Sequence, residues 1–181
     1  MKLTLSRAQL LEQWRLRAFP EPMNEGTDVT PIDGIDMDAF LEAAALDWYR
    51  HLLHTAFPAM LNPHDYAAEI APVSDGDGAM RIDLPDSTVR VLAVRLSCWN
   101  TDAEIVTDKA SPAALRQLSK FTRSGPDAPV AVWTPGSGSV LLYPAPDDGK
   151  EASLSKALLV VDTPDTFRLD SAAFTTIKPL Q

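Results

Sequence analysis

The chain of 181 residues has one cysteine, Cys98, few glycines and no long uninterrupted apolar run. A single cysteine excludes an internal disulfide and any zinc site built from several cysteines. Because no run of about 18 apolar residues is present, we expect no segment that spans a bilayer. Charged residues scattered through the first helix-like segment also break up any signal-peptide-like apolar region. These absences predict an intracellular or particle-associated protein.

The charge and the proline content further narrow the class of protein. The chain carries 16 Lys and Arg against 25 Asp and Glu, which gives a formal net charge of −9. An excess of acidic residues argues against a protein whose whole surface binds nucleic acid. We therefore expect no specific nucleic-acid recognition. The fifteen prolines outnumber the eight glycines, which predicts short elements joined by stiff connections.

Two segments repeat apolar residues at the spacing of an α-helix. The first covers about residues 7–18 and follows a capping residue, Ser6. The second covers residues 38–57, has a cap at Asp36 or Asp38, and places along one stripe Leu41, Ala45, Trp48, Leu52 and Ala56. Both are therefore predicted to be amphipathic helices that bury one face.

The segment between these helices, from Pro20 to Asp38, is rich in Pro, Gly, Asp and Glu. Such a composition is typical of a linker or loop. We therefore expect two parts in the chain, a helical arm with an acidic, Pro-rich linker over residues 1–37 and a single α+β domain over residues 38–181.

Beyond about residue 78 the apolar pattern changes from the period of a helix to a period of two, which is typical of strands. The predicted strands are 80–84, 89–99, 104–107, 129–134, 139–145 and 157–162. Short helices are expected at Pro112–Leu118 and at Phe167–Ile177, the latter capped by Asp170 or Ser171. The predicted fold class is α+β, with N-terminal helices followed by a predominantly antiparallel β-rich half that contains a short inserted helix.

Three histidines are the residues of an alternative metal-site hypothesis. His51 and His54 are three residues apart on the predicted helix, a spacing that presents two imidazoles to one ion, and His64 follows after a turn. A small metal-dependent hydrolase or metal-binding domain is therefore an alternative hypothesis. The opposing interpretation is a solvated helix face, since both His51 and His54 lie on the polar side beside Arg50.

The densest basic residues fall in two places. Arg116, Lys120 and Arg123 surround Phe121, and such a stretch could contact a nucleic-acid backbone, a protein partner or only solvent. The first helix adds Arg15 beside Trp14. The six candidate interface residues are Trp14, Arg15, Arg116, Lys120, Phe121 and Arg123. No catalytic constellation is present, so we expect no enzyme, no catalytic residue and no cofactor.

Several segments, read in order, resemble one family. They are Asp47–Arg50, Leu52–Leu53, Phe57–Pro58, Leu84–Asp86, Arg90–Leu96 with Trp99, Ser119–Arg123 with Pro126–Val130, and Leu141–Pro144. Over about residues 38–145 this layout is similar to that of the small adaptor proteins of the tailed-phage head-to-tail connector. The chain departs from the family at its end, where a long terminal helix is expected and residues 167–181 are too short to form one.

The resemblance implies a structural role. Family members have a helical part followed by a β-rich insertion that opens with a Leu-Pro-Asp step, and they form a ring under the portal without a cofactor. The expected partners are copies of the chain itself and portal or tail proteins, in the cytoplasm of the bacterial host or in the virion. A monomeric accessory binding domain is a second alternative.

Overall fold

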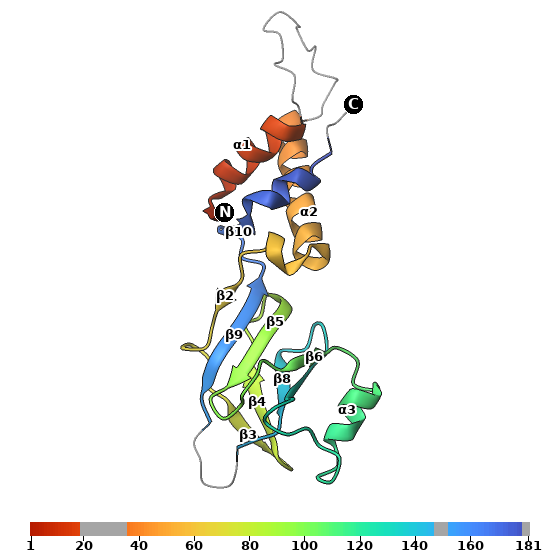
Figure 1. Cartoon of the computed structure of the whole chain (residues 1–181). Helices are drawn as coiled ribbons and strands as arrows, with labels where there is room; N and C mark the ends of the chain where they lie inside the picture. Colours follow the sequence, from red (N-terminus) through yellow and green to blue (C-terminus); the bar gives the residue numbers. More distant parts are fainter. Residues whose placement is uncertain (19–35, 147–151, 179–181) are drawn as a thin grey trace, which may run out of the picture. The chain divides into compact units, whose positions relative to one another are not determined.

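The computed structural model describes residues 1–18, 36–146 and 152–178 (Figure 1). Helices occupy the N-terminal part, and the strands form three mainly antiparallel sheets with one short helix inserted among them. The predicted α+β fold class is therefore confirmed. Within these ranges, no helix combines the length and apolar character that crossing a membrane requires.

The chain divides into two compact units. The first unit is made of Met1–Asn62 together with Asp162–Gln181, and the second unit is Pro63–Val161. This division differs from the predicted arm over 1–37 and single domain over 38–181. Both ends of the chain belong to the first unit, because its first strand pairs with its last. Most of the linker predicted from Pro20 to Asp38 lies outside the described residues.

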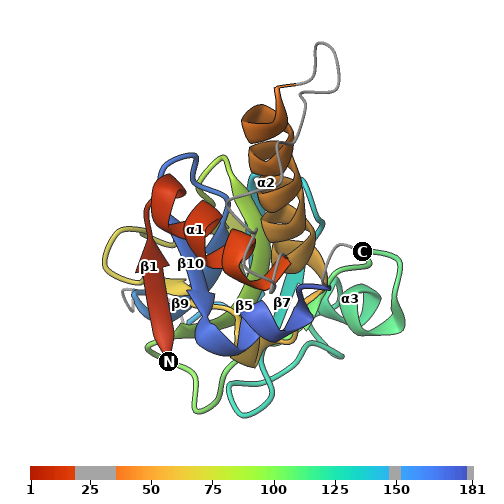
Figure 2. The ribbon, with the colours of Figure 1, turned by 90° about the horizontal axis from the view of Figure 1, so that it is seen from above.

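The first unit combines two helices with a pair of strands. Its elements are β1 (Lys2–Leu5), α1 (Arg7–Ala18), α2 (Met37–Thr55), η1 (Pro58–Met60), β10 (Phe167–Asp170) and η2 (Ser171–Thr176). Both predicted helices are present, and Asp36 caps α2 by accepting hydrogen bonds from the backbone N–H groups of Asp38 and Ala39. β1 runs antiparallel beside β10, with Lys2 opposite Asp170 (Figure 2).

The end of the chain differs from the predicted helix over Phe167–Ile177. Its first four residues form β10, in which Phe167 and Leu169 are buried at the period of a strand. Only then does the short 3₁₀ helix η2 begin, capped by Asp170, whose carboxylate accepts a hydrogen bond from the N–H of Ala172 at 2.9 Å. The predicted cap is confirmed, but the residues before it form a strand because they pair with β1.

The core of the first unit forms where α2 meets β10 and α1. Tyr49 is 1% exposed and meets the ring of Phe167 edge to face, with 4.9 Å between ring centres. Trp14 and Ala18 of α1 pack with Ala45 of α2. The buried face of α2 therefore includes Tyr49, which is not part of the predicted apolar stripe.

The second unit is built from two sheets. Its elements are β2 (His64–Asp65), β3 (Val73–Gly76), β4 (Ala79–Asp83), β5 (Thr88–Leu96), β6 (Glu104–Val106), α3 (Pro112–Gln117), β7 (Val130–Trp133), β8 (Ser139–Tyr143) and β9 (Leu154–Val161). One sheet has the order β2-β9-β5 and the other β3-β4-β8-β7-β6. The predicted hairpin of β7 and β8 is confirmed, with Val130 opposite Tyr143.

Strand β7 shows how the five-stranded sheet is buried on both faces. Ala131 and Trp133 belong to the core shared with the three-stranded sheet, whereas Val130 and Val132 belong to a second cluster that includes Ala114 of α3. A strand covered on both sides is apolar at every position rather than at alternate ones. This explains the uninterrupted sequence Val-Ala-Val-Trp, and it shows that α3 covers the outer face of the sheet.

Asp102 joins the two longest strands of the three-stranded sheet. Arg95 of β5 and Lys156 of β9 are opposite each other in the register, a pairing of like charges that is unfavourable by itself. The Asp102 carboxylate accepts hydrogen bonds from Lys156 Nζ at 2.7 Å and from Arg95 Nε at 2.8 Å. The hydrogen bond from Lys156, more than the one from Arg95, lowers the pKa of Asp102 below its ordinary value of 3.8.

Substitution of Asp102 by asparagine is expected to lower the free energy of unfolding at pH 7 by about 0.5–1 kcal/mol, because a partly exposed ion pair contributes little. A lowered carboxyl pKa contributes stability that is complete above the ordinary pKa and is lost as the pH falls through the folded-state value. The difference between wild type and D102N should therefore stay constant from about pH 5 to 8 and shrink below about pH 4. Urea unfolding at several pH values measures this, and a difference that persists in acid would contradict it.

Candidate interaction surface

Helix α3 begins as the sequence predicts. Ser111 caps it, with its hydroxyl accepting a hydrogen bond from the N–H of Ala114 at 3.3 Å, and Pro112 takes the first helical position. Proline fits there because that backbone nitrogen has no partner within the helix. The helix packs against β7, and its inward side chains are those of Ala114 and Gln117. Figure 1 shows α3 lying beside the five-stranded sheet.

Gln117 is the one buried polar residue that the structure shows among the described positions, at 1% exposure. Its Nε2 donates hydrogen bonds to the carbonyl of Ala113 and to Ser124 Oγ, each at 3.0 Å. Its Oε1 accepts a hydrogen bond from the backbone N–H of Ser124, also at 3.0 Å. A buried amide is tolerated when its donors and acceptor are satisfied in this way. Gln117 therefore connects the turn at residue 124 to the end of α3 through hydrogen bonds.

With Gln117 inside, the large apolar side chains of this segment face outward. Leu115 is 51% exposed, Leu118 71% and Phe121 86%. Basic residues lie among them, since Arg116 is exposed and Lys120 Nζ is 5.1 Å from the centre of the Phe121 ring. We call Leu115, Arg116, Leu118, Lys120 and Phe121 the α3 surface. It reverses the usual arrangement of a helix that covers a sheet, with a glutamine inside and two leucines outside.

Substitution of Gln117 by leucine is expected to lower the free energy of unfolding by about 1–3 kcal/mol. The change leaves the partly buried N–H of Ser124 without its acceptor, although the new side chain is apolar and of similar size. Urea unfolding followed by circular dichroism measures the effect. The matched control is the opposite change at an exposed position of the same helix, Leu115→Gln, which should stay within about 0.5 kcal/mol of wild type. Equal stability of the two variants would contradict a stabilising role for Gln117.

Arg123, also predicted as an interface residue, turns toward its own unit. Its Nε donates a hydrogen bond to the carbonyl of Gln117 at 2.9 Å, and its guanidinium lies over the ring of Tyr143 at 5.6 Å. Gly78 lies against this guanidinium, since a Cβ there would be 2.0 Å from Arg123 Nη1, and its φ of +71° is a conformation that favours glycine. Arg123 therefore supports the fold beneath the α3 surface.

Of the two predicted interface residues on α1, one is buried and the other reaches the surface. The prediction for Trp14 is wrong, because its side chain is 5% exposed and packs in the core between α1 and α2. Arg15 reaches the surface, where its Nη2 donates a hydrogen bond to Asp38 Oδ1 at 2.7 Å. Of the six predicted residues, Arg116, Lys120 and Phe121 are the ones that the structure places together and exposes on one segment.

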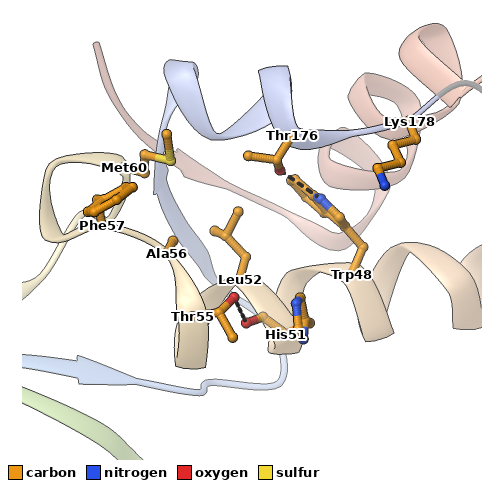
Figure 3. A pocket seen from close by; sticks show the side chains of 9 residues that line it. All are labelled: Trp48, His51, Leu52, Thr55, Ala56, Phe57, Met60, Thr176 and Lys178. Carbon is orange, nitrogen blue, oxygen red and sulfur yellow. Dashed lines mark hydrogen bonds between the residues drawn. The ribbon is translucent and has the colours of Figure 1, made fainter.

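The first unit contains a pocket of about 510 Å³. Figure 3 shows its lining, which comes from α2, the segment after it and the end of the chain. The lining residues are Trp48, His51, Leu52, Thr55, Ala56, Phe57, Met60, Thr176 and Lys178. Trp48 closes one side, because its indole Nε1 donates a hydrogen bond to Thr176 Oγ1 at 3.1 Å and its ring stacks on Phe174. The pocket is mainly apolar, and His51 contributes to its wall.

The three histidines of the metal-site hypothesis all lie within the described residues. His51 and His54 are both exposed on α2, whereas His64 belongs to the second unit and has its Nε2 3.1 Å from Glu69 Oε1. In the part of the chain that the structure describes, no group of three His, Cys, Asp or Glu side chains could hold a metal ion. The metal-site hypothesis therefore gains no geometric support from these residues.

No family model, curated protein or solved structure matches the chain. The function is therefore inferred from the chain's own surfaces. Among the described residues, the α3 surface combines the most exposed phenylalanine with two exposed leucines and two basic side chains. An exposed apolar cluster bordered by charge is the usual mark of a protein–protein interface.

Leu115 and Leu118 are absent from the interface that the sequence predicts. A helix that covers a sheet ordinarily has its leucines inward and its glutamines outward, and this short helix has the opposite polarity. The reversal depends on Ser124, which lies seven residues beyond Gln117 and gives its amide one acceptor, Oγ, and one donor, the backbone N–H. That pairing depends on the path of the turn after α3, and the path becomes visible only in the folded structure.

Proposed function

We propose that this protein is a structural, non-enzymatic component of a phage or prophage particle, which associates with copies of itself into a ring of the head-to-tail connector type. The proposal rests on the resemblance over residues 38–145 and on one structural observation, the exposure of the α3 surface. Its partners are other copies of the chain and portal or tail proteins of the particle.

The α3 surface supports an assembly role because its exposure is unfavourable for an isolated protein. Phe121 is 86% exposed and Leu118 71%, whereas large apolar groups gathered on a free surface promote association with a partner. Aromatic residues accompanied by arginine are also the residues that dominate binding energy at interfaces. An interface would bury these side chains.

The charge of the chain suits a ring around DNA. Each copy carries a formal charge of −9, so a ring of copies has a strong negative field. Like charge keeps a polyanion from adhering to the wall of a channel through which it passes. Ring closure further needs two different surfaces on each copy, because a head-to-tail interface joins unlike patches.

The association is tested by measuring mass as a function of concentration. Sedimentation velocity and negative-stain electron microscopy on the full chain, alone and with the portal protein of the same particle, should show species larger than a monomer and closed rings. A chain that stays monomeric at every concentration and binds no portal protein would overturn the proposal.

A further inference from the structure

We propose that the α3 surface of one copy binds the first turn of α2 on a second copy. The inference rests on the proposed self-association and adds to it the two surfaces that meet. We call the second of these, Asp36, Met37, Asp38 and Phe40, the α2 surface. It belongs to the first unit, whereas the α3 surface belongs to the second.

The α2 surface is apolar at its centre and acidic around it. Met37 is 51% exposed and Phe40 59%, and a spacing of three residues places them on one side of the helix. Asp38 lies between them in the sequence, and its side chain is 86% exposed. The α2 surface therefore presents the same kind of apolar group as the α3 surface, bordered by the opposite charge.

Segregation of charge along the chain extends this complementarity. Residues 109–126 contain four basic and no acidic residues, and they include the whole α3 surface. The α2 surface contains two acidic residues, Asp36 and Asp38, and no basic one. Opposite charges on facing surfaces accelerate encounter and select the partner, whereas two α3 surfaces or two α2 surfaces would repel each other. The complementary surface is therefore found on another copy of the chain.

The acidic residues of the α2 surface remain able to bind a partner. Asp38 already pairs with Arg15 at 2.7 Å. The Asp36 side chain caps α2 by accepting hydrogen bonds from backbone N–H groups of its first turn. The Asp38–Arg15 pair is exposed to solvent, and such pairs are worth about 0–1 kcal/mol. A second cation can therefore approach Asp38 without the loss of a buried interaction.

Because the two surfaces differ, the interface is of the head-to-tail kind. Each copy has one surface of each type, so a copy that binds one neighbour through α3 still offers its α2 surface to another. Such an interface closes into a ring when the rotation between copies allows it. It therefore provides the unlike patches that the proposed ring needs.

The first test removes the apolar anchor and is made on the full chain. Phe121→Ser is expected to weaken self-association by about 30-fold or more, which corresponds to the loss of about 2 kcal/mol typical of a central interface residue. The matched control is Phe57→Ser, which removes a phenylalanine of similar exposure, 76%, from the pocket of the first unit. Sedimentation velocity should show wild-type behaviour for Phe57→Ser and smaller species for Phe121→Ser.

The second test uses charge reversal, which leaves the apolar groups in place. Lys120→Glu alone and Asp38→Lys alone should each weaken self-association, because each places like charges opposite one another. The chain that carries both changes should associate again, since the acidic and the basic side chain would then have exchanged places across the interface. Circular dichroism of each variant separates loss of binding from loss of folding.

The third test mixes two variants. Phe121→Ser lacks a working α3 surface, and a Met37→Ser, Phe40→Ser variant lacks a working α2 surface. Each should be monomeric alone, and an equimolar mixture should yield heterodimers but no larger species, because one intact surface remains on each. An oligomeric wild type that is insensitive to all these changes would overturn this inference and leave the proposed function standing. A wild type that stays monomeric by itself would overturn this inference, and one that in addition binds no portal protein would overturn the proposed function as well.

Discussion

The free energy of unfolding is expected to fall by about 3–5 kcal/mol when Tyr49 is replaced by alanine. Tyr49 is 1% exposed, its ring packs edge to face on Phe167, and its hydroxyl accepts a hydrogen bond from the backbone N–H of Arg168 at 3.1 Å. The substitution therefore leaves a large cavity between α2 and β10 and an unpaired backbone donor. Urea unfolding followed by circular dichroism measures the loss.

The conservative variant Tyr49→Phe separates the two contributions. It keeps the ring against Phe167 and removes only the hydroxyl, so the expected loss is about 1 kcal/mol. Burial raises the pKa of the Tyr49 phenol above its ordinary value of 10.0, which keeps the hydroxyl protonated near neutral pH. Equal losses for Tyr49→Ala and Tyr49→Phe would contradict a role for ring packing.

A second large loss, again of about 3–5 kcal/mol, is expected in the other unit when Trp99 is replaced by alanine. Trp99 is 5% exposed and belongs to the core between the two sheets. Its indole Nε1 also donates a hydrogen bond to the carbonyl of Pro144 at 2.9 Å, which fixes the segment after β8. The alanine variant loses both the packed ring and this donor.

Trp99→Phe is the matched variant for this site. It retains most of the aromatic surface but leaves the Pro144 carbonyl without its donor, so we expect an intermediate loss of stability. Unfolding of the purified variants in urea gives the comparison. A Trp99→Ala variant as stable as wild type would show that the core between the sheets does not depend on this side chain.

Local pattern was enough to predict much of the secondary structure. The helices α1 and α2, the hairpin of β7 and β8, and the short helix α3 follow from apolar periodicity and from capping residues such as Asp36 and Ser111. These signals lie within a few residues of the element that they specify, so they can be read from the sequence alone. The same is true of the α+β fold class.

Contacts between distant residues could not be predicted in this way. Phe167 and Leu169 alternate as a strand does, but β10 becomes a strand because Leu3 and Leu5 lie opposite them at the other end of the chain. Tyr49 lies outside the apolar stripe predicted for α2, yet it is buried, and its hydroxyl accepts a hydrogen bond from the N–H of Arg168 on β10. In both cases the deciding partner is more than 100 residues away in the sequence.

The sequence by itself determined the composition of the two charged segments, the apolar pattern of the elements and the presence of a basic–aromatic stretch around Phe121. Only the tertiary structure decided which of those residues face a partner. Packing of α1 on α2 placed Trp14 in the core, and the hydrogen bonds of Gln117 turned Leu115 and Leu118 outward. The physical reason is that exposure depends on which face of an element its neighbours cover, and the neighbours of α1 and α3 are set by the fold rather than by adjacent residues.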